Sequence, residues 1–563
     1  MMLIHLYIHE HKAIRRLNVP INGRFACRVS PREAIEVEEC AASWDFYNGY
    51  ACSAIIGVNG SGKSTVLDFI SAFDKDSESV LLAIFFDAKT DTYNFCYANS
   101  TPELFGDVRA DKKFRQVLKV ERFFAHNNVQ VVSINTLPPA SAFLAGVSEA
   151  KEKAYIKNLI SGEVLKSEGR KKKYFDQIFS YLRNYPYAER LDEPCFGFSF
   201  PGAPQGMWDK LYAVLDRERF EQAAVSDVMR LNTISFELED CTAHEVFHCL
   251  VRTNIPSILN LISKRAFGVS ASFDLLAIAF FKYYVSPQGE AIHHKVELAV
   301  REVLRDMRLA DEKLAAQGAI DELENNLLEQ LWSIWDSYQA LVEVILYQCY
   351  DGEHLNLKQV KVEDYGTITS LIDAINKLPR NLSAGITWGW QGVSSGELAK
   401  MHIFSQLYGY LERAASSARP IILIDEADLY LHPEWQRTFL SDMLRMFGLI
   451  EAYKPGFKPQ LVISTHSPII VSDFLARDIT SINRDEFGGF TLGKSSGFGC
   501  SVVDIYMQDM HLSSTFGEHA RRRLTHLIEA AKNNSLSEKD RELIAEVSSE
   551  TVKGFLLSYD KNQ

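Results

Sequence analysis

The chain has 563 residues, 47% hydrophobic and 24% charged, which is typical of a folded protein with a large core and roughly two to four domains. Its formal net charge of −13 argues against a surface that is basic throughout for unselective nucleic-acid binding, although a local basic patch stays compatible with it. Nine scattered cysteines without a CxxC pair predict reduced thiols rather than a disulfide framework or a zinc knuckle.

Four segments follow one another along the chain. Residues 1–140 are expected to be mostly β, because short β-branched or aromatic stretches alternate with polar breaks. Within 141–385, apolar residues recur at three- and four-residue steps, which predicts an inserted helical domain. Its longest segments, about 295–350, are candidates for an antiparallel hairpin, with heptads too irregular for a long coiled coil. Residues 386–500 return to alternating strands and helices, and 501–563 predict a helical tail.

Neither a leader nor a membrane segment is expected. The first residues lack the cationic start and long apolar core of a signal peptide. The longest apolar run, 273–285, contains Lys282 and is too short to span a bilayer. We therefore expect a soluble, cytoplasmic protein.

The first chemical motif is GVNGSGKST, at residues 57–65. It follows the apolar stretch SAII, precedes the apolar TVLDFISAF, and fits the strand–loop–helix pattern G-x-x-x-x-G-K-[ST]. Glycines let backbone amides turn around an anion, Lys63 reaches the β- and γ-phosphates, and Ser64 offers its hydroxyl to Mg²⁺. A plain glycine-rich turn is the alternative, which the complete match disfavours. The residues predicted to bind nucleotide here are Gly57, Asn59, Gly60, Ser61, Gly62, Lys63, Ser64 and Thr65.

Two acids end the aliphatic run IILIDEAD, at residues 421–428. Asp425 is expected to hold Mg²⁺, and Glu426 to polarise the water that attacks the γ-phosphate. An ordinary strand-to-loop transition would give the same letters. Some 35 residues later, QLVISTHSP is another apolar strand, and His466 at its end is either a γ-phosphate sensor or a satisfied loop histidine.

These motifs, with the turn GVSSGELAK at 392–400 between them, resemble in their order the head of ABC-class ATPases. The resemblance implies an α/β fold, in which a mixed β lobe and a RecA-like core form a P-loop head that the helical insertion splits. It also implies that Ser395 and Gly396 bind the γ-phosphate of a nucleotide held by a second subunit, with helix 397–413 aiming its amino end there. ATP and Mg²⁺ would then bind at composite sites of a homodimer joined through its heads.

Two further stretches narrow the class. VSSGE departs from the transporter signature LSGGQ, and ADLYLHPEWQ is similar to the loop of overcoming-lysogenisation-like defence ATPases. About 97 residues follow His466, too few for the Toprim nuclease of that group, and there is no CxxC hook. The chain thus resembles the PtuA family of Septu defence systems, also found beside retron reverse transcriptases.

That resemblance implies particular partners. An HNH nuclease subunit of the PtuB kind would do the cutting, and no HNH pattern occurs in this chain. A reverse transcriptase with its DNA/RNA product, and an oligomer larger than a dimer, are further expectations. A DNA-repair or chromosome-associated ATPase that clamps DNA by itself stays open as the alternative, and a transporter subunit is a distant third.

Several other features stay ambiguous. HEVFH, at 244–248, matches a zinc motif, but no acidic third ligand follows before Glu290 and Pro256 should break the helix, so helix packing is favoured. The basic runs GRKKKYF and HARRRLTH are either solvated helix faces or nucleic-acid contacts. Gln130 is the nearest candidate for the glutamine that links nucleotide to the helical region, and WDFYNGY the nearest source of an adenine-stacking aromatic.

Overall fold

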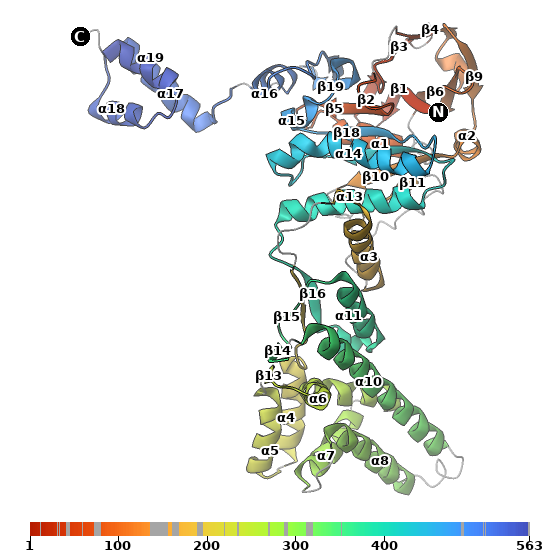
Figure 1. Ribbon diagram of the computed structural model, residues 1–563, viewed down its shortest axis with the longest axis vertical. Helices are drawn as coiled ribbons and strands as arrows, with labels where there is room; N and C mark the ends of the chain where they lie inside the picture. Colours follow the sequence, from red (N-terminus) through yellow and green to blue (C-terminus); the bar gives the residue numbers. More distant parts are fainter. Residues whose placement is uncertain are drawn as a thin grey trace. The chain divides into compact units, whose positions relative to one another are not determined.

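The chain forms two compact units, one made of residues 1–164 and 395–563 and the other of residues 165–394 (Figure 1). The computed structural model describes all residues outside the following set: 12, 31, 33, 41–44, 59, 72–79, 136–155, 160–167, 189–194, 219, 234–235, 268–270, 287–290, 311–318, 351, 486–488, 511, 513 and 561–563. None of the described helices combines the length and the apolar character that crossing a bilayer requires.

The first unit is built on a seven-stranded sheet, ordered β11-β10-β17-β18-β5-β19-β20. Every neighbouring pair is parallel except β19 with β20. Parallel strands buried on both faces are continuous apolar runs, and β17 and β18 have that sequence character. The strands are β5 (Ala51–Ile56), β10 (Val129–Asn135), β11 (Ile156–Asn158), β17 (Arg419–Asp425), β18 (Gln460–Ser464), β19 (Ile479–Arg484) and β20 (Phe490–Gly493).

Two smaller sheets, β2-β1-β6-β7-β9 and β3-β4-β8, form a β lobe in the same unit. Alternation along β1 divides its side chains between two cores: Leu6 packs with the seven-stranded sheet, whereas Tyr7 packs with the aromatic core of the lobe. The strands are β1 (Met2–His11), β2 (Ile14–Pro20), β3 (Phe25–Ser30), β4 (Ala34–Glu39), β6 (Val80–Asp87), β7 (Thr92–Ala98), β8 (Asp107–Ala110) and β9 (Lys113–Val117).

Helices cover the large sheet. Those of the head are α1 (Lys63–Ser71), α2 (Val120–Asn127), α13 (Ser395–Arg413), α14 (Pro433–Tyr453), α15 (Pro468–Val471) and α16 (Val502–Asp504). Val66 and Ile70 of α1 share one core with Leu423 and Val462 of the sheet. Near the carboxyl terminus, α17 (Glu518–Lys532), α18 (Glu538–Ala545) and α19 (Glu550–Asp560) bury a small core of their own.

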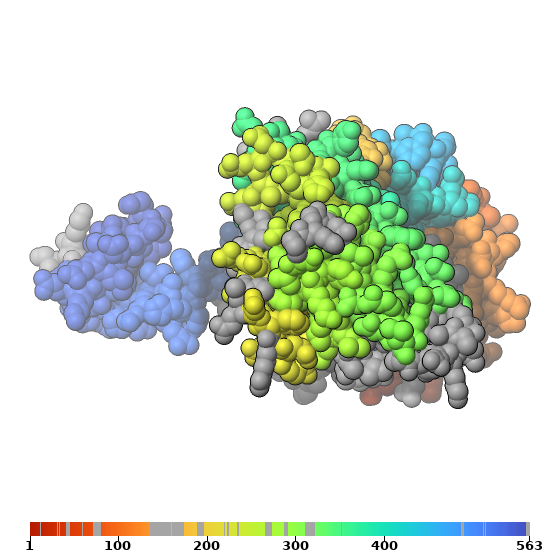
Figure 2. All heavy atoms as spheres, turned by 90° about the horizontal axis from the view of Figure 1, so that it is seen from below, coloured from red at the N-terminus to blue at the C-terminus, as the bar shows by residue number. Residues whose placement is uncertain are grey.

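The second unit is mostly helical. Its helices are α3 (Glu168–Asn184), α4 (Gln205–Arg217), α5 (Gln222–Met229), α6 (Ala243–Phe267), α7 (Ala271–Val285), α8 (Ile292–Ala310), α10 (Ala319–Cys349), α11 (Tyr365–Lys377) and α12 (Arg380–Ser383). They enclose one apolar core. Figure 2 shows the outer surface of this unit in yellow and green.

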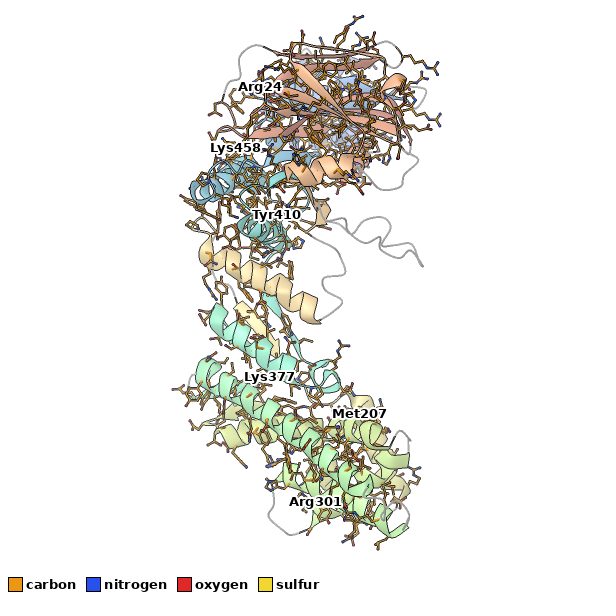
Figure 3. All side chains as sticks on the ribbon, turned by 90° about the vertical axis from the view of Figure 1, so that its right-hand side faces the viewer. Arg24, Met207, Arg301, Lys377, Tyr410 and Lys458 are labelled. Atoms are coloured by element: carbon orange, nitrogen blue, oxygen red, sulfur yellow. The ribbon has the colours of Figure 1, made fainter. Side chains whose placement is uncertain are left out.

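The hairpin expected near 295–350 is present. Trp335 Nε1 donates to Glu297 at 2.9 Å, while Arg308, at the other end of α8, lies 2.9 Å from Glu324 near the start of α10. Such pairing requires two antiparallel helices. Arg301, labelled in Figure 3, adds a 2.9 Å ion pair with Glu324.

Strands also occur in this unit, where the sequence pattern predicts only helices. They are β12 (Cys195–Ser199), β13 (Glu237–Glu239), β14 (His354–Asn356), β15 (Val360–Val362) and β16 (Thr387–Gln391). In CFGFS and TWGWQ, large aromatics alternate with smaller residues, which is a two-residue period. Five-residue strands are easily missed beside long helical patterns.

Candidate nucleotide-binding site

The phosphate loop connects β5 to α1. Gly57, Gly60 and Gly62 have φ of 147°, 77° and 91°, values that residues with a Cβ seldom adopt. A Cβ on Gly57 would lie 2.2 Å from the carbonyl oxygen of Ile482, so this turn requires glycine for space as well. The backbone therefore makes the tight turn that an anion-binding loop needs before a helix start.

Lys63 begins α1 and is 6% exposed. Its ammonium donates to the carbonyl oxygens of Gly57 at 3.1 Å and Val58 at 3.3 Å, which holds the side chain against the loop. Burial lowers the pKa of Lys63, while the Asp425 and Glu426 carboxylates act against that shift. The cation is thus held at the loop and within electrostatic range of both acids.

The rest of the loop has hydroxyl groups. The Ser61 hydroxyl is fully buried and has no hydrogen-bond partner among the described residues. Ser64 and Thr65 follow Lys63 in the first turn of α1. Asn59 lies outside the described residues. A buried hydroxyl without a partner, a buried lysine and a glycine-built turn fit a bound polyphosphate.

Both acids of the second motif stand where β17 ends. Strands β5, β18 and β17 are parallel neighbours, so their carboxyl ends meet at one sheet edge. The Ser464 hydroxyl, at the end of β18, donates to Asp425 and accepts from the Glu426 amide at 2.8 Å. Glu426 has φ of 50°, a left-handed conformation that turns its side chain out of the strand direction. Asp425 has the oxygen donors that Mg²⁺ prefers.

The electrostatics of Glu426 suit a base. Burial raises its pKa first, and the neighbouring Asp425 and Asp428 carboxylates raise it further, against the opposing effect of Lys63. A raised carboxyl pKa increases the basicity of the ionised form toward neutral pH. For His466, burial and then Lys63 lower the pKa, so the imidazole is held neutral near pH 7.

Asp428 links two loops, the one after β17 that carries the acids and the one after β18 that carries His466. Its Oδ1 accepts from the Thr465 hydroxyl at 2.5 Å and from the His466 amide at 2.9 Å. The sequence analysis assigns no function to Asp428 or Ser464. No local pattern identifies them, because their partners lie 37 to 39 residues away in the chain.

The SSGE turn lies at the start of α13, whose first residue is Ser395. Ser395 is exposed and Gly396 is buried. A Cβ on Gly396 would lie 2.7 Å from the Trp435 ring and 2.9 Å from the Tyr430 carbonyl oxygen. Gly396 is therefore required by packing within the chain, whereas Ser395 is exposed at the start of the helix.

The start of α14 contacts both the SSGE helix and the loop that carries His466. His432 caps the helix by accepting from the Glu434 amide, with Pro433 in the first turn. Gln436 donates to the Leu431 carbonyl oxygen at 2.8 Å and accepts from the Ser467 hydroxyl at 2.6 Å. LHPEWQ thus contacts the SSGE helix through Trp435 and the residue after His466 through Gln436.

Comparison with known proteins agrees with this motif order. The family model described as "AAA domain, putative AbiEii toxin, Type IV TA system" matches residues 372–472, the part that holds SSGE, both acids and His466. The chain is 34% identical over 85 residues to the Retron Vc95 probable ATPase of Vibrio cholerae serotype O1 biovar El Tor, and 38% identical over 66 residues to the Septu protein PtuA of Bacillus thuringiensis. The aligned parts cover 15% and 14% of those relatives, and 15% and 12% of this chain.

The matched region is similar to PtuA-like P-loop ATPases of defence systems. It is related to phage-defence ATPases, as the resemblance in the sequence predicts. The chain's α/β architecture, with a largely parallel sheet and many helices, is compatible with that family.

Two of the candidates that the sequence offers lie away from the phosphate loop. Gln130 pairs with Pro420 near the start of β10, whereas Asn135 at the other end pairs with Asp425. Its side chain accepts from the Tyr410 hydroxyl at 2.5 Å; Tyr410 is labelled on α13 in Figure 3. Gln130 is therefore at the opposite sheet edge, and a role in contacting nucleotide does not fit its position.

The aromatics of WDFYNGY are also engaged elsewhere. Tyr47 donates to Asp478 at 3.1 Å and Tyr50 donates to Glu451 at 2.7 Å, both before β5 begins. Trp44 lies outside the described residues.

HEVFH lies on α6 with the His244 and His248 rings stacked at 5.8 Å. Burial lowers the pKa of His248 to about 4, with Arg252 acting in the same direction. No cluster of three metal-binding side chains exists in the described part of the chain. The expected break at Pro256 is wrong, because α6 continues through it.

In the turn before Pro256, side chains donate hydrogen bonds to backbone carbonyl oxygens of α6. Thr253 donates to the Cys249 carbonyl oxygen at 2.8 Å, and Asn254 donates to that of Leu250 at 2.9 Å. Packing and these bonds offset the missing proline amide.

The basic runs are both on helices. In α17, Arg521 and Arg522 pair with Glu518 at 2.7 Å on an exposed face. In α3, the side chains of residues 168–173 lie outside the described set.

Proposed function

We propose that this chain is a Mg²⁺-dependent ATPase whose two sites form between paired heads, and whose nucleotide state regulates a partner nuclease in phage defence. The main support is the convergence of Lys63, Glu426 and His466 at the carboxyl edge of one sheet, beside a glycine-built loop. In parallel α/β sheets, ligands bind at that edge.

The residues have separate roles in this proposal. The loop amides and Lys63 hold the phosphates, and Ser64 and Asp425 hold the metal. When bound, Mg²⁺ neutralises charge on the β- and γ-phosphates. Glu426, oriented through Ser464, takes a proton from the attacking water. Neutral His466, held through its amide by Asp428, donates a hydrogen bond to the γ-phosphate.

Ser395 completes the site of a second copy of the chain. Ser395 is exposed at the start of α13, so its hydroxyl and the positive end of that helix can reach a phosphate on another subunit. A homodimer through the heads would hold two such sites, and larger assemblies of dimers are compatible with it.

The partner proposal is supported by the names of the relatives. Septu and retron systems have several components, so we propose an HNH nuclease subunit and, in a retron setting, a reverse transcriptase with its DNA/RNA product. Expression with neighbouring genes followed by affinity purification tests this. Co-purification of a nuclease with an intact chain supports the proposal, and recovery of the ATPase alone from a complete operon contradicts it.

Replacing Lys63 by alanine tests the nucleotide site. ATP affinity should fall at least about tenfold, because a charge-assisted contact to the phosphates is lost. Fluorescent-ATP titration measures it, with Lys113→Ala, an exposed lysine on β9, as the matched control. Equal affinity in Lys63→Ala and the control would overturn the phosphate-loop assignment.

A further inference from the structure

A second pocket lies at the amino edge of the seven-stranded sheet. It has a volume of about 740 Å³ and is lined by the first residues of three parallel strands, Ala51, Arg419 and Gln460. The phosphate loop, Asp425 and Ser464 follow or end those same strands, so the pocket is a site separate from the nucleotide motifs. Its volume is within the range of about 300–1,000 Å³ that small-molecule sites occupy.

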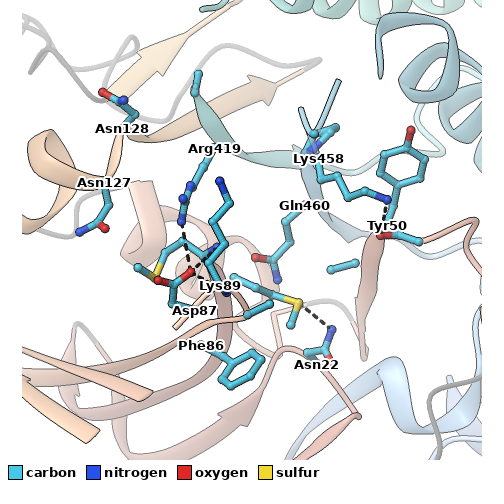
Figure 4. A pocket seen from close by; sticks show the side chains of 18 of the residues that line it. Asn22, Tyr50, Phe86, Asp87, Lys89, Asn127, Asn128, Arg419, Lys458 and Gln460 are labelled. Atoms are coloured by element: carbon cyan, nitrogen blue, oxygen red, sulfur yellow. Dashed lines mark hydrogen bonds and ion pairs between the residues drawn. The ribbon is translucent and has the colours of Figure 1, made fainter. Parts of the chain in front are cut away.

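One wall of the pocket has two cationic side chains whose hydrogen-bond donors are not all used within the described residues. Lys89 and Arg419 stand side by side above Asp87 (Figure 4). Arg419 Nη1 lies 3.5 Å from Asp87 Oδ1, which is an ion pair, but this buried atom makes no hydrogen bond with any described residue. Lys89 is exposed, and its ammonium has no ion pair within the described chain.

Asp87 cannot satisfy both cations. Its carboxylate already accepts from the Thr90 hydroxyl at 3.0 Å and from the Lys89 amide at 3.3 Å. Those bonds favour its ionised form, and its single negative charge already faces Arg419 at 3.5 Å and the Met1 ammonium at 3.8 Å, so it does not also neutralise Lys89.

Three further cations, Arg24, Lys458 and Arg477, line the pocket, and each lies beside a carboxylate. Arg24 pairs with Glu39, Lys458 lies 3.5 Å from Glu451, and Arg477 lies 3.9 Å from Asp478. Asp478 accepts from the Tyr47 hydroxyl and the Gly23 amide, and Asp45 accepts from the Gly49 amide, so both are committed to the protein. Among the described residues, Lys89 is thus the lysine or arginine of this lining without an ion pair, and it lies next to Arg419 in a chain of net charge −13, which favours an anionic ligand at these two residues.

We infer that this pocket binds a phosphorylated small molecule of nucleotide size, with a phosphate group held between Lys89 and Arg419. Arginine supplies a planar fork of donors and lysine a point charge, a combination that suits tetrahedral phosphate oxygens. A pocket of this limited volume, lined by Asp87 and by the first residues of three strands, favours a small ligand over a nucleic-acid strand. The inference does not depend on ATP hydrolysis at the phosphate loop.

The full-length Lys63→Ala chain allows the test, because it weakens the other phosphate site. Pyrophosphate and ADP are titrated by calorimetry into this chain and into versions that also carry Lys89→Glu or Arg419→Gln. We expect saturable binding that each second change weakens about tenfold or more, the loss expected for a charged hydrogen bond. Arg15→Ala, an exposed arginine on β2, is the matched control and should leave binding unchanged.

The outcomes separate the alternatives. Binding insensitive to Lys89→Glu and Arg419→Gln, or absent in Lys63→Ala, overturns the second site. Because Lys89 is exposed, Lys89→Glu leaves folding intact and its result stands without Arg419→Gln. A single-stranded oligonucleotide that binds with the same dependence while pyrophosphate and ADP do not would overturn the small-molecule assignment.

Discussion

The two edges of the seven-stranded sheet differ in the groups that lie there and in how much of each edge the sequence predicts. At the carboxyl edge, Lys63, Glu426 and His466 are charged or polar groups with shifted pKa values, and Glu426 has a left-handed backbone. At the amino edge, Gln130 bonds to Tyr410, and Gln460 bonds to the backbone of Leu3. These two glutamines are thus satisfied by the protein, and the ligand inferred at that edge depends on Lys89 and Arg419 instead, whereas the carboxyl edge keeps its groups reactive.

That contrast predicts that changes at the carboxyl edge affect turnover and changes at the amino edge affect stability. The largest effect is expected for Glu426→Gln, which should bind ATP but hydrolyse it about 10²–10⁴-fold more slowly, the range for loss of a general base. Steady-state ATPase assays measure it, with the exposed Glu434→Gln as control. Turnover close to that of the unchanged chain would exclude Glu426 as the base and direct attention to His466.

The pH dependence of turnover should report the same carboxyl. Because burial and two acids raise the pKa of Glu426, the ionised base is lost as pH falls through a value above the usual 4.5. Below that pKa, kcat should fall about tenfold for each pH unit. This acid limb should be absent in the residual activity of Glu426→Gln. An identical limb in both proteins would assign it to another group.

Gln436→Ala should have an intermediate effect. It removes the bonds to Leu431 and Ser467, which costs about 1–3 kcal/mol of stability for partly buried partners. Because Ser467 follows His466, kcat should fall several-fold with little change in KM. Arg437→Ala, an exposed neighbour on α14, is the control. Loss of stability without loss of kcat would limit Gln436 to a structural role.

The smallest effect is expected at the other edge. Tyr410→Phe removes the hydroxyl that bonds to Gln130, so unfolding free energy should fall by about 1 kcal/mol while ATP affinity and kcat stay unchanged. Denaturant unfolding and ATPase assays on one preparation measure both. A drop in kcat larger than the fall in folded fraction would show that the amino edge communicates with the site.

Local patterns were enough to predict the parts of the site that depend on one short segment. The glycine spacing of 57–62 and the acids after IILI determine a turn and a strand end, which adjacent residues alone dictate. The family resemblance and the α8–α10 hairpin also follow from sequence patterns, and the structure and comparisons support both.

Contacts between distant segments could not be predicted in this way. The Asp428–Thr465 and Gln436–Ser467 bonds depend on the register of β17 against β18, which no single motif encodes. The candidate Gln130 stays ambiguous from sequence for the same reason, because its end of β10 becomes known only once its pairing with Pro420 is known. Pro256 shows the reverse case, in which tertiary support keeps a helix that local propensity would end.

The central claim is that each ATP site needs residues from two chains, and mixing two inactive variants tests it most directly. Ser395→Arg blocks the helix start, and this position is preferable to Gly396 because any side chain at Gly396 would also collide with Trp435. Lys63→Ala removes the proposed phosphate contact. If the heads pair as proposed, each variant alone would form dimers without a complete site.

In a mixed dimer, the chain with Ser395→Arg still has an intact phosphate loop, and it faces the intact SSGE turn of its partner. One of two sites is then complete. With random exchange of chains and independent sites, half of the dimers are mixed, so ATPase activity should recover to about a quarter of that of the unchanged chain. Titrating one variant into the other at constant total protein measures this. Full activity of Ser395→Arg by itself would contradict the account and make GVSSGELAK a helix cap alone.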